Sequence, residues 1–150
     1  MIYVKKILNL LKKKNINFIC GVPDSVLKSF SNLIGKRSYF KHITAVNEGS
    51  AVSLGIGFHL STKKVPCIYF QNSGLGNAIN PLVSISHPKV YSIPALLVIG
   101  WRGSPRLKDE PQHKAKGLIT KKILTLLNIR FCILRKTKDL KQLEKIINFS

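Results

Sequence analysis

The amino-acid sequence predicts an α/β domain, a doubly wound parallel sheet with helices on both faces. Short apolar runs alternate along the chain with longer segments of helical periodicity, a pattern typical of parallel strands joined by helices. Glycines and small polar residues directly follow several of these runs, and ligands of open α/β sheets bind where parallel strands end. With 150 residues, the chain is long enough for a single domain with a buried core.

The first half of the chain alternates between helix and strand. In the opening helix Ile7, Leu8 and Leu11 fall on one face, which we expect to pack on the sheet. Asp24 or Ser25 can cap the second helix. The expected elements are a helix over 2–14, a strand over 17–21, a helix up to 34, a strand over 42–46 and a helix over 47–60. The last helix contains three glycines, and because glycine weakens helices, we expect another backbone to pack closely against it.

The second half continues the alternation but includes a long irregular stretch. Pro81 falls inside a helical pattern and predicts a kink or a break. Residues 95–100 are apolar without interruption, as in a strand buried on both faces. Residues 101–117 are rich in proline, glycine and charge and predict a long loop, which in a compact domain is usually functional. The expected elements are a strand over 65–70, a helix over 76–86, a strand over 95–100, a helix over 118–127, a strand over 130–134 and a helix over 139–147.

The chain is strongly basic, with 25 lysines and arginines against 6 acidic residues and a net charge of +19. The lysines of the terminal segments alternate with leucine and isoleucine, which indicates solvated helix faces. A basic module that binds nucleic acid or a scaffold is the alternative from another class, although aromatic residues do not interleave with the basic clusters. An acidic partner surface or an anionic substrate fits the charge as well.

The cysteines and the hydropathy point to a cytoplasmic protein. Cys20, Cys67 and Cys132 each lie inside an apolar run without CxxC spacing, so we expect buried, reduced thiols and no metal site. No apolar stretch is long enough for a transmembrane helix. The N-terminus carries lysines within its apolar residues and no cleavage site, which favours an amphipathic helix over a signal peptide.

Glu48 is the first candidate for chemistry. It follows an apolar strand and opens a helix of small residues, whereas the other five acidic residues lie in predicted loops or at helix ends. A partly desolvated carboxyl group at such a place suits proton transfer or a hydrogen bond with a ring nitrogen. The alternative is a favourable negative charge in the first turn of a helix.

The glycine-rich turn after the strand at 65–70 is the second candidate. Its GLGN sequence at 74–77 lacks both the lysine of a phosphate loop and the third glycine of a dinucleotide-binding fingerprint. What remains is a tight turn with the amides of Gln71, Asn72 and Asn77 available to a neutral polar ligand. Because parallel strands end at one edge, we expect this turn and the acidic helix start to share a single site.

The long loop is the third candidate. It contains DEPQH at 109–113, preceded by Arg102, Arg106 and Lys108. At the carboxyl edge of the sheet His113 can serve as acid, base or hydrogen-bond donor. The forked donors of arginine match the oxygens of a phosphonate or a carboxylate. A simple solvated loop is the alternative.

Five motifs in order give the sequence a family resemblance that covers about residues 1 to 135. They are GVPDS at 21–25, NEG at 47–49, QNSGLGN at 71–77, IGWRG at 99–103 and DEPQH at 109–113. The chain resembles the N-terminal, pyrimidine-binding domain of phosphonopyruvate decarboxylases, which use thiamine diphosphate. The sulfopyruvate decarboxylase alpha subunit shares some of these motifs, whereas IGWRG and DEPQH are more similar to the phosphonopyruvate branch.

The resemblance implies a thiamine diphosphate-binding fold and a role for each candidate residue. Glu48 would hydrogen-bond the aminopyrimidine ring of the cofactor and would be catalytic together with His113. The remaining implied roles are cofactor binding by Gln71, Asn72, Ser73 and Gly74, and substrate binding by Asp24, Ser25, Asn77 and Arg102. The reaction implied is the conversion of 3-phosphonopyruvate to phosphonoacetaldehyde and CO2, with sulfopyruvate decarboxylation as the alternative.

One part of the family pattern is not in the sequence. Full-length family enzymes hold the diphosphate through Mg2+ in a second domain, with a Gly-Asp-Gly string and a later Asn-Asn pair, and neither string occurs here. We therefore expect residues 1–150 to be a single pyrimidine-binding domain that works in a homo- or hetero-oligomer. A separate subunit or domain would hold the Mg2+ and the diphosphate. An inactive truncated fragment is the alternative.

Overall fold

The structure is a computed structural model that describes residues 2–105 and 108–148. Its strands are β1 (Phe18–Gly21), β2 (Lys41–Thr44), β3 (Cys67–Gln71) and β4 (Leu96–Gly100). Its α-helices are α1 (Ile2–Lys13), α2 (Lys28–Ile34), α3 (Glu48–Thr62), α4 (Leu75–Pro81), α5 (Pro111–Leu126) and α6 (Leu140–Ile147). Short helical turns are η1 (Asn72–Gly74), η2 (Leu82–Ser86) and η3 (Thr137–Asp139).

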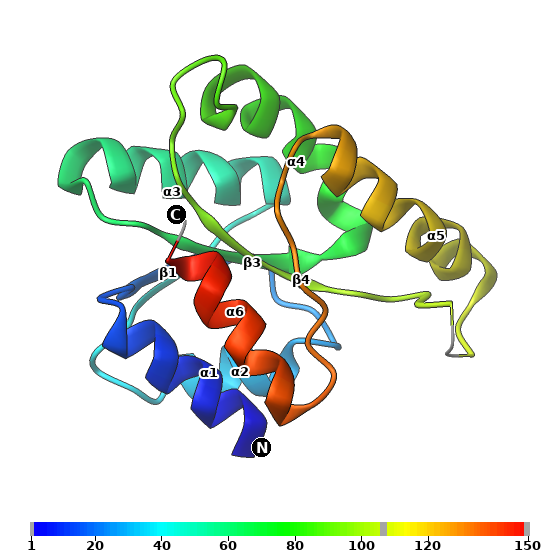
Figure 1. The fold of residues 1–150 in the computed structure, drawn as a ribbon, viewed down its shortest axis with the longest axis horizontal. Helices are drawn as coiled ribbons and strands as arrows, with labels where there is room; N and C mark the ends of the chain where they lie inside the picture. Colours follow the sequence, from blue (N-terminus) through cyan, green and yellow to red (C-terminus); the bar gives the residue numbers. More distant parts are fainter. Residues whose placement is uncertain (1, 106–107, 149–150) are drawn as a thin grey trace.

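The elements form three layers around a parallel sheet, as the sequence predicts. The strand order is β2-β1-β3-β4, and each neighbouring pair is parallel. Helices α3, α4 and α5 cover one face of the sheet, and α1, α2 and α6 cover the other (Figure 1). Alternate residues of each strand point to opposite faces, so Ile19 joins the core under α1 while Cys20 joins the core under α3.

The amphipathic face predicted for the first helix is confirmed. Ile7, Leu8 and Leu11 are 7%, 0% and 0% exposed, and all three belong to the core between α1 and the sheet. The lysines of this helix lie on its other side, where Lys12 and Lys13 occupy the last turn and favour the helix C-terminus electrostatically. The basic residues of α1 are therefore solvated, in agreement with the sequence pattern.

The strand predicted over 130–134 is wrong. The chain there belongs to no strand, and among the described residues β4 is the last strand of the sheet on this side. Apolar, β-branched composition favours a strand only where a neighbouring strand supplies the hydrogen-bond ladder. The segment instead runs past the free edge of β4 on its way from α5 to α6 (Figure 1).

The long loop predicted over 101–117 is shorter than expected, because α5 begins at Pro111 instead of residue 118. Proline suits the first helical position, where its fixed φ and its missing N–H cost nothing. Glu110 precedes it in an extended conformation, with φ −63° and ψ 150°, and ends the loop. The prolines of this stretch predict a loop, but Pro111 starts a helix.

The glycine prediction for α3 holds at one position. A Cβ on Gly49 would lie 2.9 Å from the backbone oxygen of Asn77, so the start of α4 packs directly on this glycine. Gly55 faces the Ile68 side chain and not a backbone, and Gly57 has nothing within 4 Å. In the neighbouring helix the break predicted at Pro81 is confirmed, since α4 ends there and a π-helical turn follows.

The cysteines are free thiols, and two of the three are buried as predicted. Burial raises the pKa of the Cys20 thiol to about 12 and raises that of Cys67 as well, so neither ionises near neutral pH. Cys132 is only half-buried, because it lies in the segment that forms no strand. None of the helices in the described ranges is both long and apolar enough to cross a membrane.

Candidate active site

The candidate residues gather at the carboxyl edge of the sheet. Because all four strands are parallel, the segments that follow them meet at this edge. Asp24 and Ser25 follow β1, Glu48 follows β2, Gln71 ends β3, and Arg102 follows β4. His113 reaches the same region from the first turn of α5. Arg106, part of the same basic loop, lies outside the described residues.

Glu48 is the first residue of α3, and local hydrogen bonds hold it there. Asn47 is extended, with φ −155° and ψ 173°, and its side chain accepts a hydrogen bond from the Ser50 N–H, as a helix N-cap does. The Glu48 side chain is half-buried. Its Oε2 accepts a hydrogen bond of 2.8 Å from Nδ2 of Asn77 on α4. The carboxylate therefore points across to the neighbouring helix start and not into bulk solvent.

Gly74 is the residue that makes room for this carboxylate. A Cβ at position 74 would lie 2.0 Å from both Cδ and Oε1 of Glu48, a separation that atoms in contact never reach. The backbone of η1 therefore packs directly against the carboxyl group. With the amide of Asn77 on one oxygen and the glycine beside the other, the orientation of Glu48 is determined from two sides.

This contact predicts that Gly74→Ala displaces the Glu48 carboxylate. The methyl group fits only if the carboxyl group or the η1 backbone moves, and a displacement of about 1 Å at a reacting group can cost on the order of 100-fold in rate. Gly76→Ala is the matched control, since a Cβ there meets nothing within 4 Å. The NMR chemical shift of the Glu48 side-chain carboxyl carbon, compared between each variant and the unaltered chain, reports the displacement. An equally small change in both variants would contradict this role of Gly74.

The amides that follow β3 differ in what they contact. Asn72 is 4% exposed, and its Nδ2 donates to the Arg102 carbonyl at 3.0 Å and to Oγ1 of Thr120 at 2.9 Å. Its Oδ1 accepts from the Arg102 N–H at 3.0 Å. Gln71 Oε1 accepts from the Ser73 hydroxyl at 2.8 Å. Asn72 thus ties β3 to the loop after β4 and to α5, while Gln71 keeps its Nε2 donors and Ser73 keeps the acceptor capacity of its hydroxyl for a ligand.

Arg102 forms a two-pronged ion pair with Asp109. Its Nε donates to Oδ2 at 2.8 Å, and its Nη2 donates to Oδ1 at 2.5 Å. Asp109 also accepts from the N–H groups of Gly103 and Glu110. The remaining donor, Nη1, faces the hydroxyl of Ser25 at 3.4 Å. Nε and Nη2 of Arg102 are therefore both hydrogen-bonded to Asp109, and Nη1 is directed toward the residues that follow β1.

The hydrogen bonds from Arg102, with those from the two backbone N–H groups, hold the pKa of Asp109 well below its usual range. A depressed carboxyl pKa stabilises the fold at pH values above about 3.9, the unfolded value, and this contribution is lost as the pH falls through the folded pKa. We therefore expect Asp109→Asn to lower the urea midpoint at pH 7 and to have a clearly smaller effect at pH 2, well below the unfolded value. A difference of the same size at both pH values would contradict the assignment.

Asp24 and Ser25 lie in the turn between β1 and α2. Asp24 Oδ1 accepts from the N–H groups of Val26 and Leu27 and so caps the turn that precedes α2. The expectation that Asp24 or Ser25 caps the helix itself is wrong, because α2 begins at Lys28 with Leu27 at its N-cap position and no side-chain hydrogen bond to the cap. The second oxygen, Oδ2, is buried without a hydrogen-bond partner among the described residues. An orphaned carboxylate oxygen is costly, so its position favours a ligand or a partner group at this point.

His113 has a comparable orphaned atom. Its Nδ1 is buried and without a hydrogen-bond partner in the described part of the chain. The loop after β4 packs on the histidine backbone through Gly103, which adopts a φ of +66°; a Cβ there would lie 1.7 Å from the His113 carbonyl oxygen. Gly117 in turn packs on the Gly103 carbonyl. Two glycines therefore hold the N-terminal turn of α5 against the candidate site.

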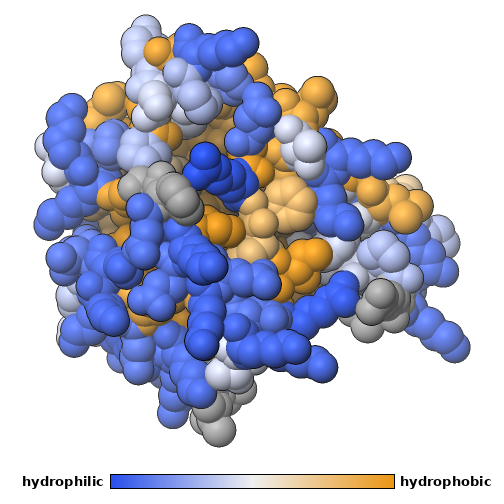
Figure 2. All heavy atoms as spheres, viewed as in Figure 1, coloured by the Kyte–Doolittle hydropathy of each residue, from blue (hydrophilic) through white to orange (hydrophobic). Residues whose placement is uncertain are grey.

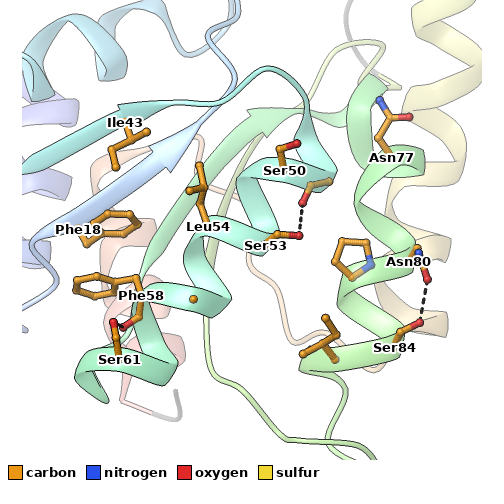
Figure 3. Close-up of a pocket in the computed structure, with 14 residues that line it drawn as sticks. Phe18, Ile43, Ser50, Ser53, Leu54, Phe58, Ser61, Asn77, Asn80 and Ser84 are labelled. Atoms are coloured by element: carbon orange, nitrogen blue, oxygen red, sulfur yellow. Dashed lines mark hydrogen bonds between the residues drawn. The ribbon is translucent and has the colours of Figure 1, made fainter.

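A shallow groove of about 880 Å3 lies between α3 and α4, beginning at Asn77 (Figure 3). Its lining is uncharged and combines glycines and serines with apolar side chains. Ser50 and Ser53 face it from α3, Asn80 faces it from α4, and Ser84 faces it from η2 (Figure 3). The other lining residues are Phe18, Ile43, Gly49, Leu54, Gly57, Phe58, Ser61, Asn77, Pro81 and Ile85. The surface beside Glu48 is therefore one on which another backbone can approach closely.

No Lys or Arg occurs in residues 42–62 or 65–88, which contain α3 and α4, although the chain has 25 such residues. The basic residues lie instead on the other helices, on β2 and in the connections. Within these two ranges Glu48 is the one acidic or basic side chain besides histidine. Depletion of charge is typical of the centre of a protein interface.

The described residues contain no group of three or more His, Cys, Asp or Glu that could hold a metal ion. The site instead combines a fixed carboxylate beside the uncharged groove, several amides, and two orphaned polar atoms, one in the turn after β1 and one on α5. This donor set fits the organic half of a cofactor such as a pyrimidine ring, whose nitrogens pair with carboxylate and amide groups. A parallel α/β fold with such a site at its carboxyl edge defines a nucleotide- or cofactor-binding domain.

Comparison with known proteins identifies the class. Residues 1–123 match the family described as the thiamine pyrophosphate enzyme, N-terminal TPP binding domain. The chain belongs to this family. Thiamine pyrophosphate and thiamine diphosphate are the same compound, so the family agrees with the resemblance stated above.

Particular relatives are decarboxylases. Over 124 residues the chain is 37% identical to a phosphonopyruvate decarboxylase of Streptomyces viridochromogenes, matching 83% of this chain and 30% of that protein. It is 39% identical to the sulfopyruvate decarboxylase subunit alpha of Methanocaldococcus jannaschii, matching 82% of this chain and 70% of the relative. The benzoylformate decarboxylase structure from Polynucleobacter necessarius superposes with a TM-score of 0.60 at 28% identity, over 72% of this chain and 20% of that one. The chain thus spans less than a third of the phosphonopyruvate enzyme.

Two features of the site were not found from the sequence. Thr120 anchors Asn72 from the middle of α5, and Gly103 takes a left-handed conformation that lets α5 approach. Thr120 carries no local signal, because its contact with position 72 spans 48 residues. A glycine in the loop that follows a strand is a signal for Gly103, but the sequence does not say which backbone it contacts.

Proposed function

We propose that this chain is the pyrimidine-binding part of a thiamine diphosphate-dependent decarboxylase of 2-keto acids. The favoured substrate is 3-phosphonopyruvate, which would give phosphonoacetaldehyde and CO2, and sulfopyruvate is the second candidate. A separate subunit or domain would hold the diphosphate and Mg2+. The relatives that support the proposal are decarboxylases of both substrates.

The geometry of Glu48 is the observation that carries the proposal. The carboxylate is fixed by Asn77 and Gly74 at the edge where ligands of this fold class bind. In this position it would hydrogen-bond a nitrogen of the pyrimidine ring and hold or release a proton there. Bound thiamine diphosphate supplies the electron sink that decarboxylation of a 2-keto acid requires. Gln71 and Ser73 would orient the ring from the η1 side.

The uncharged groove beside Glu48 is the reason to expect a partner surface. Glu48 lies beside the uncharged groove between α3 and α4, so the pyrimidine ring would be enclosed only when a second protein surface covers it. Exclusion of water strengthens every electrostatic interaction in such a site. Alone, the chain is expected to release no CO2 from either substrate.

The substrate would be recognised at the same carboxyl edge of the sheet, by residues that follow β1 and β4. Nη1 of Arg102 lies 3.4 Å from the hydroxyl of Ser25 there, and the residue before Ser25 is Asp24, whose Oδ2 is buried without a partner among the described residues. A phosphonate or sulfonate oxygen can accept from the first two groups, and His113 would face the same space from α5. Asp109 keeps Arg102 aimed in this direction through its two hydrogen bonds.

The test uses the chain assembled with a diphosphate-binding chain that carries the Gly-Asp-Gly and Asn-Asn strings. CO2 release is measured with 3-phosphonopyruvate, with sulfopyruvate and with pyruvate as the control that lacks a second anion. The proposal expects release only from the complex, and a kcat/KM for 3-phosphonopyruvate that exceeds the value for pyruvate at least tenfold, about the worth of one charge-assisted hydrogen bond. A complex that binds thiamine diphosphate but prefers pyruvate would overturn the substrate assignment. Sulfopyruvate as the better substrate would select the second candidate.

A further inference from the structure

The side chain of Tyr69 on β3 crosses the neighbouring strand β1, on the face of the sheet that α1 and α2 cover. Gly21 of β1 pairs with Tyr69 on one side and with Thr44 of β2 on the other, so the three residues stand side by side across the sheet. A Cβ on Gly21 would lie 2.5 Å from Cδ1 and 2.7 Å from Cγ of Tyr69. The ring therefore occupies the space that a side chain at position 21 would need.

The hydroxyl of Tyr69 reaches the edge strand β2. It lies 2.9 Å from Nε2 of His42, with the side chain of Thr44 beside it. Burial, together with the negative charge of Asp24, raises the pKa of Tyr69 to about 12, and burial lowers the pKa of His42. Near neutral pH the hydroxyl therefore keeps its proton and can donate a hydrogen bond to the uncharged imidazole. This bond fixes the ring at its outer end.

Both ends of the turn between β1 and α2 rest on this ring. The chain leaves the sheet after Gly21, which packs on the ring, and returns at Phe30 of α2, whose ring meets that of Tyr69 edge-on with centroids 5.8 Å apart. Asp24 and Ser25 lie between these two contacts. The ring is thus a shared support for the segment that carries two of the groups proposed to bind the substrate.

Tyr69 is out of reach of a ligand at the proposed site. Its side chain is 0% exposed and belongs to the core between the sheet and α1, α2 and α6, whereas Glu48 opens α3 on the other face. In Figure 2 the surface over α1, on the lower left, is largely hydrophilic and covers this core. An effect of Tyr69 on the reaction must therefore pass through the turn.

We propose that Tyr69 is a positioning residue for the substrate-binding turn and that its hydrogen bond to His42 holds it in place. The inference rests on the proposed function for the roles of Asp24 and Ser25. Without the hydroxyl, the ring can shift beneath the turn, because nothing else fixes its outer end as firmly. The turn then loses the support that keeps the hydroxyl of Ser25 at 3.4 Å from Nη1 of Arg102.

The first experiment measures hydrogen exchange by NMR on the full chain, with Tyr69→Phe as the variant. The amides of Val26 and Leu27 donate to Oδ1 of Asp24, so they report whether the turn is closed. We expect both amides to exchange about three to ten times faster in the variant, the range set by one net hydrogen bond. The amide of Ser50, which is bound to the N-cap side chain of α3 on the other face, should keep its exchange rate.

Two further comparisons separate the hydroxyl from general damage to the fold. Tyr39→Phe is the matched control, because it removes a hydroxyl that lies 3.3 Å from the Lys12 carbonyl, at the opposite edge of the sheet. The two reporter amides should exchange in this control as in the unaltered chain. His42→Ala removes the partner of the hydroxyl and should reproduce the effect of Tyr69→Phe. His42→Gln retains a hydrogen-bonding side chain and should restore most of the protection.

The second experiment measures decarboxylation by the complex with the diphosphate-binding chain. Tyr69→Phe should raise the KM for 3-phosphonopyruvate about three- to tenfold, the range of one net hydrogen bond, and should leave kcat within about twofold. The KM for pyruvate, which lacks the second anion, should change less. A merely structural role would instead reduce the amount of active complex, and kcat would fall without a change in KM.

Three results would overturn the inference. They are unchanged exchange at the reporter amides in Tyr69→Phe, equal acceleration at Ser50, and faster exchange of the turn with an unchanged KM in an active complex. Failure of the proposed function would look different, because the complex of the unaltered chain would then release no CO2. The exchange measurement needs no decarboxylation, so it tests the support of the turn in either case.

Discussion

Glu48→Gln is expected to abolish decarboxylation by the assembled protein while leaving the assembly intact. The amide has the shape of the carboxylate and can still accept the hydrogen bond from Asn77, so the packing against Gly74 survives. It can neither carry the negative charge nor exchange a proton with a ring nitrogen. Loss of proton transfer by one positioned group costs about 100-fold to 10,000-fold in rate. Single-turnover CO2 release, with size-exclusion chromatography of the complex, measures both parts of the prediction.

Glu144→Gln is the control for this variant. Glu144 lies on α6, on the opposite face of the sheet, where its half-exposed side chain is 3.9 Å from Lys13. A surface pair of this kind contributes little to stability, so turnover should match that of the unaltered chain. Should Glu48→Gln retain turnover within a factor of about three, Glu48 would be a helix-capping charge and not the catalytic carboxylate.

Gly103→Ala is expected to destabilise the fold more than any other small-residue change at the site. The φ of +66° places this residue in the left-handed region, and the added methyl group would meet the His113 carbonyl at 1.7 Å. Backbone strain and overpacking together cost about 2–5 kcal/mol. The loop after β4 would have to separate from α5, and the Arg102–Asp109 pair would move with it. Urea unfolding followed by circular dichroism measures the change.

Gly57→Ala is the matched control, because a Cβ at position 57 meets nothing within 4 Å. Replacement of an exposed helical glycine by alanine should stabilise α3 by about 0.5–1 kcal/mol. The two variants make the same chemical change and are expected to shift the midpoint in opposite directions. If Gly103→Ala unfolds at the same urea concentration as the unaltered chain, that result would contradict the close packing of the loop after β4 on α5.

The fold class could be predicted because the informative signals are local. Each of the four strands carries its own apolar run, and α1 presents Ile7, Leu8 and Leu11 at helical spacing. The segment 130–134 has the same kind of signal and is not a strand, because pairing depends on a neighbour that local composition cannot supply. The start of α5 was predicted too late for a different reason. Proline ends some helices and starts others, so Pro111 alone does not show that a helix begins there.

The candidate site could be predicted in outline from strand order and motif position. Glu48 and Asn77 were singled out separately, and the structure joins them by a hydrogen bond. The partner of Arg102 was not foreseen, since pairing with Asp109 depends on how the loop after β4 folds back. The hydrogen bonds of the Asn72 amide could not be predicted either, because its partners Arg102 and Thr120 lie far from it in the sequence.

The most direct test of the central claim is a crystal structure of the chain with its diphosphate-binding partner and thiamine diphosphate. The account predicts a carboxylate oxygen of Glu48 within about 2.6–3.2 Å of a pyrimidine ring nitrogen, the range of a hydrogen bond that can transfer a proton. A pyrimidine ring bound elsewhere, with Glu48 hydrogen-bonded to Asn77 alone, would contradict it.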